Sequence, residues 1–311
     1  MRLAFMGTPQ FAVPSLEALL DEGYEVAGAF TQPDRPVGRG HRLAACPVKE
    51  AALARGVQVY QFERLRSQEG LDCLRALAPD LVVTAAFGQI LSQALLDVPR
   101  LGTINVHASL LPAYRGAAPI NWCIINGETR TGVTTMLTDA GVDTGAMLLS
   151  RATQIGAGET AGELAQRLSH IGAQLLIETL RGYIAGQIKP VAQDESKASR
   201  QPMLTKEMGK IDWTMSAEKI ANRVRGLDPW PCAYTDYAGG TLKVYRARAA
   251  AGEGAPGAVL RASAREGLLV ACGEGAFEIL EMQAPGGKRM SARAYLAGKR
   301  IEEGTKLGEG S

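Results

Sequence analysis

Two polar side chains lie close together in the stretch INVHASLLPAYRGAAP, residues 104–119. Asn105 and His107 are two residues apart, so on a strand they point to the same face. The amide of Asn105 is a neutral donor suited to a developing oxyanion, and the imidazole of His107 can exchange a proton near neutral pH. Because burial of either group without a partner is costly, a buried strand that carries both indicates a specific reason for them.

A carboxylate would be expected to orient the imidazole. The loop TDAGVDTG, residues 138–145, offers Asp139 and Asp143, and the spacing alone does not choose between them. The alternative interpretation is a hydrogen-bonded core histidine beside a structural asparagine. An Asn-x-His pair at a strand end, with an acidic loop downstream, favours catalysis over that alternative.

The elements that must position these residues alternate between strand and helix over the first 185 residues. The apolar runs 2–7, 24–32, 79–87 and 102–107 predict strands, and 159–186 predicts a long amphipathic helix. This alternation is typical of a Rossmann-like α/β domain with a mostly parallel sheet. Ligands bind such sheets beyond the carboxyl ends of the strands, which is where Asn105 and His107 are expected.

The pattern changes after residue 188. Residues 189–206 are polar and interrupted by proline, which predicts a linker. Residues 207–311 show short strand patterns separated by turn signals, which predicts a smaller β-barrel of the OB type. We therefore expect a catalytic domain over residues 1–188, a linker over 189–206 and a C-terminal barrel domain over 207–311.

Composition excludes several classes of protein. The net charge of +2 is too small to indicate a nucleic-acid binder, so any basic surface must be local. The five cysteines are widely spaced, and no Cys or His cluster has the spacing of metal ligands, so we expect a reducing compartment and no metal. Without a signal-peptide core or a membrane-length apolar run, we expect a cytoplasmic protein that acts as a monomer.

Several motifs together resemble the folate-dependent formyltransferases. The N-x-H of residues 105–107, the SLLP of residues 109–112 and the DAGVDTG loop of residues 139–145 form the signature of that family. TQPDRPVGRG at 31–40 and GKIDW at 209–213, followed by LDPWP, narrow the resemblance to the branch that acts on methionyl-tRNA. The resemblance extends from about residue 2 to at least residue 248 and is weaker beyond it.

The resemblance implies a reaction and a set of catalytic residues. The formyl group of 10-formyltetrahydrofolate would pass to the α-amino group of methionine on initiator tRNA. The catalytic roles fall on Asn105, His107 and Asp143, which selects Asp143 over Asp139. Attack by the amine would form a tetrahedral oxyanion stabilised by Asn105 and charged His107. His107 would also transfer protons, with Asp143 fixing its ring.

The resemblance also implies a folate site. Its expected residues are the SLLP motif and three residues at the end of the strand at 79–87, where position and resemblance together suggest a wall of the pterin pocket: Ser109, Leu110, Leu111, Pro112, Phe87, Gly88 and Ile90. Two departures from the family pattern, Ala113-Tyr114 and His41, do not touch the proposed chemistry.

Two groups of cations are candidates for binding tRNA. Arg35, Arg39 and Arg42 lie in the glycine-containing loop PDRPVGRGHR, which the resemblance implies reaches the tRNA acceptor end, with Arg39 as the strongest candidate. Lys288 and Arg289 begin a basic cluster near the C-terminus that could hold a nucleic-acid backbone. A solvated loop and a solvated turn or helix are the respective alternatives.

Two other functions are compatible with these residues. One is a formyltransferase that acts on a small amine such as a nucleotide or sugar-nucleotide, which would share the Asn-x-His pair and the acidic loop. It would not need the loop at 31–40 or the C-terminal domain. The other is a catalytically silent RNA-binding relative, which would have no reason to keep buried polar residues at 105, 107 and 143.

Overall fold

The computed structural model describes residues 1–37 and 42–309 of the 311-residue chain. The chain divides into two compact units. Unit 1 comprises Met1–Gly116, Thr131–Thr153 and Ala165–Gln201, and unit 2 comprises Ala117–Arg130, Gln154–Leu164 and Pro202–Ser311. Unit 2 therefore takes two short segments that are interspersed with the segments of unit 1.

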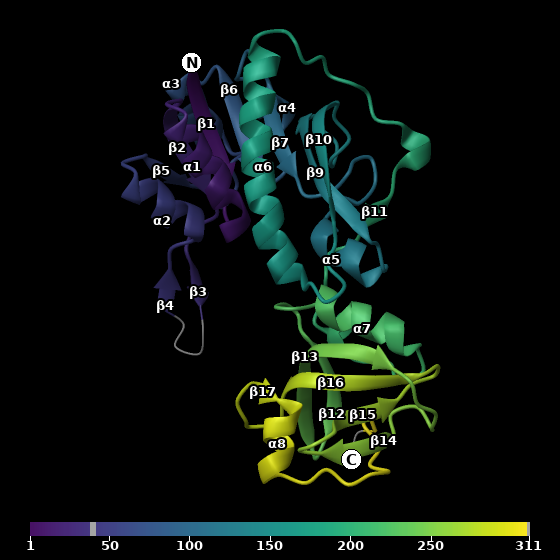
Figure 1. The fold of residues 1–311 in the computed structure, drawn as a ribbon. Coiled ribbons are helices and arrows are strands. Elements are labelled where there is room, and N and C mark those ends of the chain that lie inside the picture. Colours follow the sequence, from purple (N-terminus) through teal and green to yellow (C-terminus); the bar gives the residue numbers. More distant parts are fainter. Residues whose placement is uncertain (38–41, 310–311) are drawn as a thin grey trace. The chain divides into compact units, whose positions relative to one another are not determined.

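Unit 1 is built on a seven-stranded sheet with the order β10-β9-β7-β6-β1-β2-β5 (Figure 1). The parallel pairs are β1 with β2, β1 with β6, β6 with β7 and β2 with β5, whereas β9 is antiparallel to β7. The strands are β1 Arg2–Gly7, β2 Glu25–Thr31, β5 Val59–Gln61, β6 Leu81–Ala85, β7 Thr103–His107, β9 Arg130–Leu137 and β10 Met147–Gln154. The predicted mostly parallel sheet is confirmed.

Helices cover this sheet. They are α1 Val13–Asp21, α2 Pro47–Ala54, α3 Gln68–Leu77, α4 Gln93–Leu96 and α6 Ala161–Ile184. Unit 1 also contains the short 3-10 turns η1 Gln10–Ala12 and η2 Glu195–Lys197. The long helix α6 runs along the strands (Figure 1). Burial on both faces explains why β1 and β6 are continuous apolar runs: Leu3, Phe5 and Val83 are fully buried, and so are Ala4, Met6 and Val82.

Close packing of α6 against β7 determines which side chains at the end of β7 face away from the helix. A Cβ on Gly172 of α6 would lie 2.8 Å from a methyl group of Val106, so the helix can approach β7 only because residue 172 is glycine. Side chains alternate along a strand, so Asn105 and His107 lie on the face away from α6. The same-face placement predicted for this pair is therefore present.

Two small pairings complete unit 1. The strands β3 Arg35–Val37 and β4 Arg42–Ala44 form an antiparallel hairpin, and β8 Arg115–Gly116 pairs in parallel with β11 Arg200–Gln201. The second pairing belongs to the segment expected to be a linker. Residues up to 201 of that segment are part of unit 1, and unit 2 resumes at Pro202.

Unit 2 contains an antiparallel sheet with the path β12-β13-β16-β15-β14, and β17 pairs with β16. Its strands are β12 Ala233–Tyr237, β13 Gly240–Ala250, β14 Val259–Ser263, β15 Gly267–Ala271, β16 Ala276–Gln283 and β17 Met290–Ser291, and its helices are α5 Pro119–Ile125, α7 Ala217–Gly226 and α8 Ala292–Gly298, with the 3-10 turn η3 Glu207–Gly209. Trp213 packs edge-on against Phe277 in the core of this unit.

The prediction for the C-terminal region is confirmed only in part. The antiparallel β domain is present. Within the described residues, however, the end strands β12 and β14 do not pair with each other, so the sheet is open and the expected closed barrel is not found. Closure depends on pairing between strands distant in sequence, which short strand patterns do not specify.

Candidate active site

The carboxyl end of β7 carries Asn105 beside the neighbouring strand β6. The Thr84 hydroxyl donates to Oδ1 of Asn105 at 2.8 Å. This bond uses the amide's acceptor, and no described residue accepts a hydrogen bond from its Nδ2. Asn105 is therefore held in place with its donor available, which is the arrangement that stabilising an oxyanion requires.

His107 is nearly completely buried, with 6% of its surface exposed, and both ring nitrogens face acceptors. Its Nε2 lies 3.0 Å from the Tyr114 carbonyl oxygen, and its Nδ1 lies 3.6 Å from Oδ1 of Asp143. A carbonyl can only accept, so Nε2 carries hydrogen and donates to Tyr114. The Nδ1–Oδ1 separation from Asp143 is longer than a normal hydrogen bond but places the carboxylate directly beside the ring.

The two acids left open by the sequence have different surroundings. Asp143 adopts a left-handed backbone conformation, with φ of 55°, and its Oδ2 accepts from the Gly116 amide at 2.8 Å. Asp139 instead accepts from the Gly141 amide at 3.1 Å and from the Thr144 hydroxyl at 2.8 Å within its own loop. Asp143 therefore lies beside His107, while Asp139 shapes the loop that carries it.

Glycine is required at one point of this acidic loop. A Cβ on Gly145 would lie 1.8 Å from the Leu137 carbonyl oxygen, which no side chain can tolerate. The loop therefore turns back directly against the end of β9. This close approach fixes the position of the loop backbone two residues after Asp143, the residue that lies beside His107.

The SLLP motif forms a tightly bonded turn next to β7. The Ser109 hydroxyl donates to the Ala113 carbonyl at 2.7 Å, and the Thr134 hydroxyl donates to the Ser109 carbonyl at 2.8 Å. Ser109 and Leu111 are buried, whereas Leu110 and Pro112 are half-buried. Half of the motif thus shapes the turn and half of it is accessible to a ligand.

The three residues predicted after β6 differ in exposure: one is buried and two are exposed. Phe87 is buried in the core cluster that contains Ala4 and Met6. Gly88 and Ile90 are exposed, Ile90 by 65%. The exposed pair is available to line a ligand site, whereas Phe87 supports it from beneath.

The structure describes only part of the predicted tRNA loop. Arg35 is exposed and pairs with Glu63 at 2.7 Å. Arg39 and His41 lie outside the described residues, and for Arg42 only the backbone, in β4, is described. The predicted grouping of these three arginines therefore stays a prediction.

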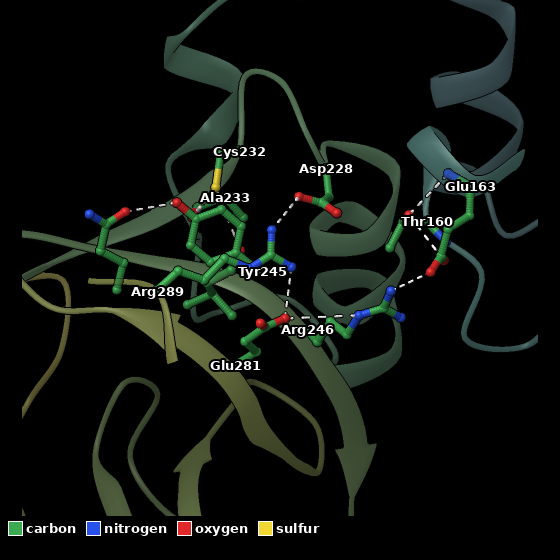
Figure 2. A network of polar contacts seen from close by, with 11 residues as sticks. Thr160, Glu163, Asp228, Cys232, Ala233, Tyr245, Arg246, Glu281 and Arg289 are labelled. Carbon is green, nitrogen blue, oxygen red and sulfur yellow. Dashed lines mark hydrogen bonds and ion pairs between the residues drawn. The ribbon is translucent and has the colours of Figure 1, made fainter. Parts of the chain in front are cut away.

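The adjacent cations Lys288 and Arg289 have different environments. Lys288 is exposed and has no acidic partner in the described part of the chain. Arg289 donates to Glu281 at 2.7 Å and stacks 4.1 Å above the ring of Tyr245, as Figure 2 shows. Its bond to Glu281 raises the pKa of Arg289 and lowers that of Glu281.

Asp228 is the buried member of the same network (Figure 2). It is 7% exposed, its Oδ1 has no hydrogen-bond partner, and the nearest guanidinium nitrogen of Arg289 is 3.9 Å away. Burial raises the pKa of Asp228 above its ordinary value, and the charges of Arg289 and Arg246 only partly oppose that rise. Arg246 itself pairs with Glu163 and lies 3.9 Å from Glu281.

Sequence reasoning missed the residues that hold the His107–Asp143 pair. These are the backbone of Tyr114 and Gly116 and the side chains of Arg115 and Gln193. Backbone partners leave no signal in residue type. Arg115 is next to the SLLP motif and could have been considered, but nothing in the sequence shows that its guanidinium is buried.

Comparisons with known proteins identify the family of this chain. A family model described as formyl transferase matches residues 1–180, and one described as formyl transferase, C-terminal domain, matches residues 203–300. The methionyl-tRNA formyltransferase of Geobacter sulfurreducens is 52% identical over 309 residues, which cover 99% of this chain and 97% of that protein. That of Solibacter usitatus is 55% identical over 312 residues, covering 100% and 99%. This chain belongs to the methionyl-tRNA formyltransferase family.

More distant solved structures share the fold of this family member. HypX from Aquifex aeolicus aligns with a TM-score of 0.65 at 18% identity, covering 98% of this chain and 50% of HypX. The sugar 3N-formyl transferase WlaRD aligns with a TM-score of 0.65 at 16% identity, covering 90% and 97%. At these identities the likeness establishes the architecture alone.

The described residues contain neither a metal-binding cluster nor a membrane-spanning helix. No group of three or more His, Cys, Asp or Glu side chains in that part of the chain is arranged to hold a metal ion. Likewise, none of the helices in the described ranges has the length and apolar character needed to cross a membrane.

The buried Asp228 should make stability depend on pH. Its pKa is higher in the folded than in the unfolded protein, so the folded state keeps a proton that the unfolded state releases, and stability falls as pH rises through this window. Asp228→Asn should remove the fall. The unfolding free energy of Asp228→Asn minus that of the unmodified protein should therefore increase as pH rises above about 4. The increase should be at most ~1.4 kcal/mol per pH unit and should then level off.

Chemical denaturation across this pH range measures the effect. Glu266→Gln, at an exposed acid of the same unit, is the control and should give a constant difference. A constant difference for Asp228→Asn would contradict the assignment.

Proposed function

We propose that this protein transfers the formyl group of 10-formyltetrahydrofolate to the α-amino group of methionyl initiator tRNA, giving N-formylmethionyl-tRNA for translation initiation. The observation that carries the proposal is the convergence of Asn105, His107 and Asp143 at one sheet edge, in a chain matched along its length by methionyl-tRNA formyltransferases. We also propose that it acts in the cytoplasm.

The folate would supply the formyl group, and the residues at the end of β7 would direct its transfer. Attack by the amine forms a carbon–nitrogen bond and turns the formyl oxygen into an oxyanion, which the free Nδ2 of Asn105 would stabilise. When the bond to N10 of the folate breaks, N10 gains a proton and the amine loses one. His107 would carry these protons, and its Nε2–H would then exchange the Tyr114 carbonyl for the substrate.

The structure supports a site for the folate at this edge. The half-buried Leu110 and Pro112 follow β7 and the exposed Gly88 and Ile90 follow the adjacent strand β6, so both pairs offer apolar surface beyond the carboxyl ends of these strands, while Ser109, Leu111 and Phe87 are buried. HypX, which shares the fold, was determined in complex with tetrahydrofolic acid. A folate donor is therefore the proposed co-substrate.

Residues 207–311 are proposed to bind the tRNA, together with the loop at 33–42. The exposed Lys288 supports the first part of this proposal, because its charge is not neutralised by a described acid. The alternative, transfer to a small amine, is weaker because the relatives that match the whole chain are named for methionyl-tRNA. The alternative of a silent relative is weaker because the site's polar residues are intact and partnered.

The catalytic assignment predicts the effect of removing either donor. Asn105→Ala should lower turnover by ~10²–10³-fold, because an oxyanion donor contributes about that much, and His107→Ala should cause a comparable loss. Transfer from 10-formyltetrahydrofolate to charged initiator tRNA, with charged elongator tRNA as a comparison, is the measurement. His170→Ala, at an exposed histidine, is the matched control. Near-normal turnover of either variant would refute the assignment.

The loop hypothesis predicts a selective loss. Arg39→Ala should weaken the use of tRNA while leaving folate binding unchanged, because an arginine that contacts phosphate or base edges acts only on the nucleic acid. Steady-state kinetics in tRNA and a direct folate-binding titration separate the two effects. Arg66→Ala, at another exposed arginine, serves as the control. Equal loss of folate and tRNA binding would reject the hypothesis.

The two adjacent C-terminal cations should behave differently. If Lys288 contacts a phosphate, Lys288→Ala should reduce the salt dependence of tRNA affinity by about one counterion without changing stability. Arg289→Ala should instead lower thermal stability, because it leaves Glu281 and Asp228 without their shared cation. Salt titrations and melting curves measure these effects, with Lys219→Ala as the control. If tRNA affinity shows little salt dependence, the backbone-holding role is wrong.

A further inference from the structure

The side chain of Gln193 connects the acidic loop to the rest of unit 1. Its Nε2 donates to the backbone carbonyls of Asp143 and Gly145, at 2.8 and 2.7 Å. Its Oε1 accepts from Nε of Arg115 at 2.9 Å. The Gln193 amide thus uses both its oxygen and its nitrogen in hydrogen bonds. One of the bonds from its nitrogen goes to the backbone of Asp143, the residue that lies beside His107.

Arg115 anchors the other end of this amide. It is 1% exposed, and its Nη1 and Nη2 donate to both carboxylate oxygens of Glu195, at 2.9 and 2.6 Å. A bidentate pair of this kind fixes direction as well as distance. The Glu195 bond raises the pKa of Arg115, so the buried guanidinium is firmly held in its charged form.

The backbone around Arg115 supplies the remaining contacts of the His107–Asp143 pair. Tyr114 gives the carbonyl that His107 meets, and the Gly116 amide donates to Asp143. This stretch is itself tied to the segment 189–201, since the Tyr114 amide donates to the Ser199 hydroxyl at 2.8 Å and the Arg115 amide to the Ser199 carbonyl at 2.8 Å. The segment therefore holds both neighbours of the His107 ring.

Asp143 is the residue in this arrangement that most needs an external hold. Its φ of 55° lies in the left-handed region, which a residue other than glycine adopts at a cost. Gln193 bonds to the carbonyl of this same residue and so resists rotation of its peptide toward a relaxed conformation. If the peptide rotated, the carboxylate would lose its place beside Nδ1 of His107.

We propose that Gln193 is a positioning residue for the transfer reaction, acting through Asp143 on His107, with the Arg115–Glu195 pair as its anchor. The inference rests on the proposed function for the reaction it serves. The competing explanation is that Gln193 only fastens the segment 189–201 to unit 1 through Arg115. Two substitutions at residue 193 distinguish these explanations.

Gln193→Leu removes both the donors and the acceptor, whereas Gln193→Glu keeps an acceptor for Arg115 and replaces the donors with a carboxylate oxygen. If positioning depends on the donors, both variants should lower kcat by ~10–100-fold, the range expected when an outer partner of a catalytic group is lost. The KM values for the folate and the tRNA should change by less than about threefold, because no substrate contact is removed. Gln187→Leu, the same change at an exposed glutamine, should have no effect.

A double variant tests whether the effect passes through Asp143. In an Asp143→Asn background, Gln193→Glu should lower kcat by no more than about threefold further, because residues that act as a unit are not additive. Near-normal kcat in Gln193→Glu would overturn the proposal in favour of simple anchoring. An equal loss in both backgrounds would overturn it too.

Ring ¹⁵N NMR of the three histidines gives a readout that does not depend on tRNA as the substrate. Gln193→Leu and Gln193→Glu should shift the His107 ring signals in the free protein, and Gln187→Leu should not. Unchanged His107 signals would reject the proposal. Failure of the unmodified protein to formylate methionyl-tRNA would instead refute the proposed function. The His107 ring signals would still decide whether Gln193 positions His107.

Discussion

The arrangement of the candidate active site depends on the burial of one imidazole. His107 is 6% exposed, so each ring nitrogen must meet a polar partner or incur the cost of an unsatisfied buried group. The partners are both acceptors, the Tyr114 carbonyl and the Asp143 carboxylate, and they come from different loops. Those loops must therefore be held in fixed positions, which explains why so many hydrogen bonds of unit 1 join backbone carbonyls and amides around residues 112–116 and 139–145.

One loop contains two acids that do different work because of the geometry of its backbone. Asp139 accepts from the Gly141 amide and the Thr144 hydroxyl of its own loop, which stabilises a turn that closes against Leu137 at Gly145. Within that frame, the left-handed conformation at Asp143 directs its carboxylate out of the loop toward His107 and the Gly116 amide. The acid that shapes the loop and the acid that serves the histidine cannot exchange roles without rebuilding the turn.

The sequence predicts the parts of this structure that rest on periodicity. Continuous apolar runs identify β1 and β6, and the two-residue spacing of Asn105 and His107 places them on one face of β7. It does not distinguish Asp139 from Asp143 by spacing, because both lie in the same short loop. Nor does it reveal the role of the segment 189–201, whose contacts join Gln193 and Ser199 to backbone groups and leave no hydrophobic pattern. Composition alone makes that segment resemble a linker.

In the basic cluster of unit 2, the number of cations in the sequence likewise does not show which of them are neutralised by an acid. Lys288 and Arg289 are equivalent in a count of cations, yet Arg289 shares Glu281 with Arg246 and stacks on Tyr245, while Lys288 faces solvent. A paired cation contributes little field to a polyanion, because its partner's charge lies only a few ångströms away, well inside the screening length of ~8–10 Å. The positive surface available to a nucleic acid is therefore set by which cations lack acids. Because that depends on strand pairing in β16 and β17, it becomes visible only in the folded unit.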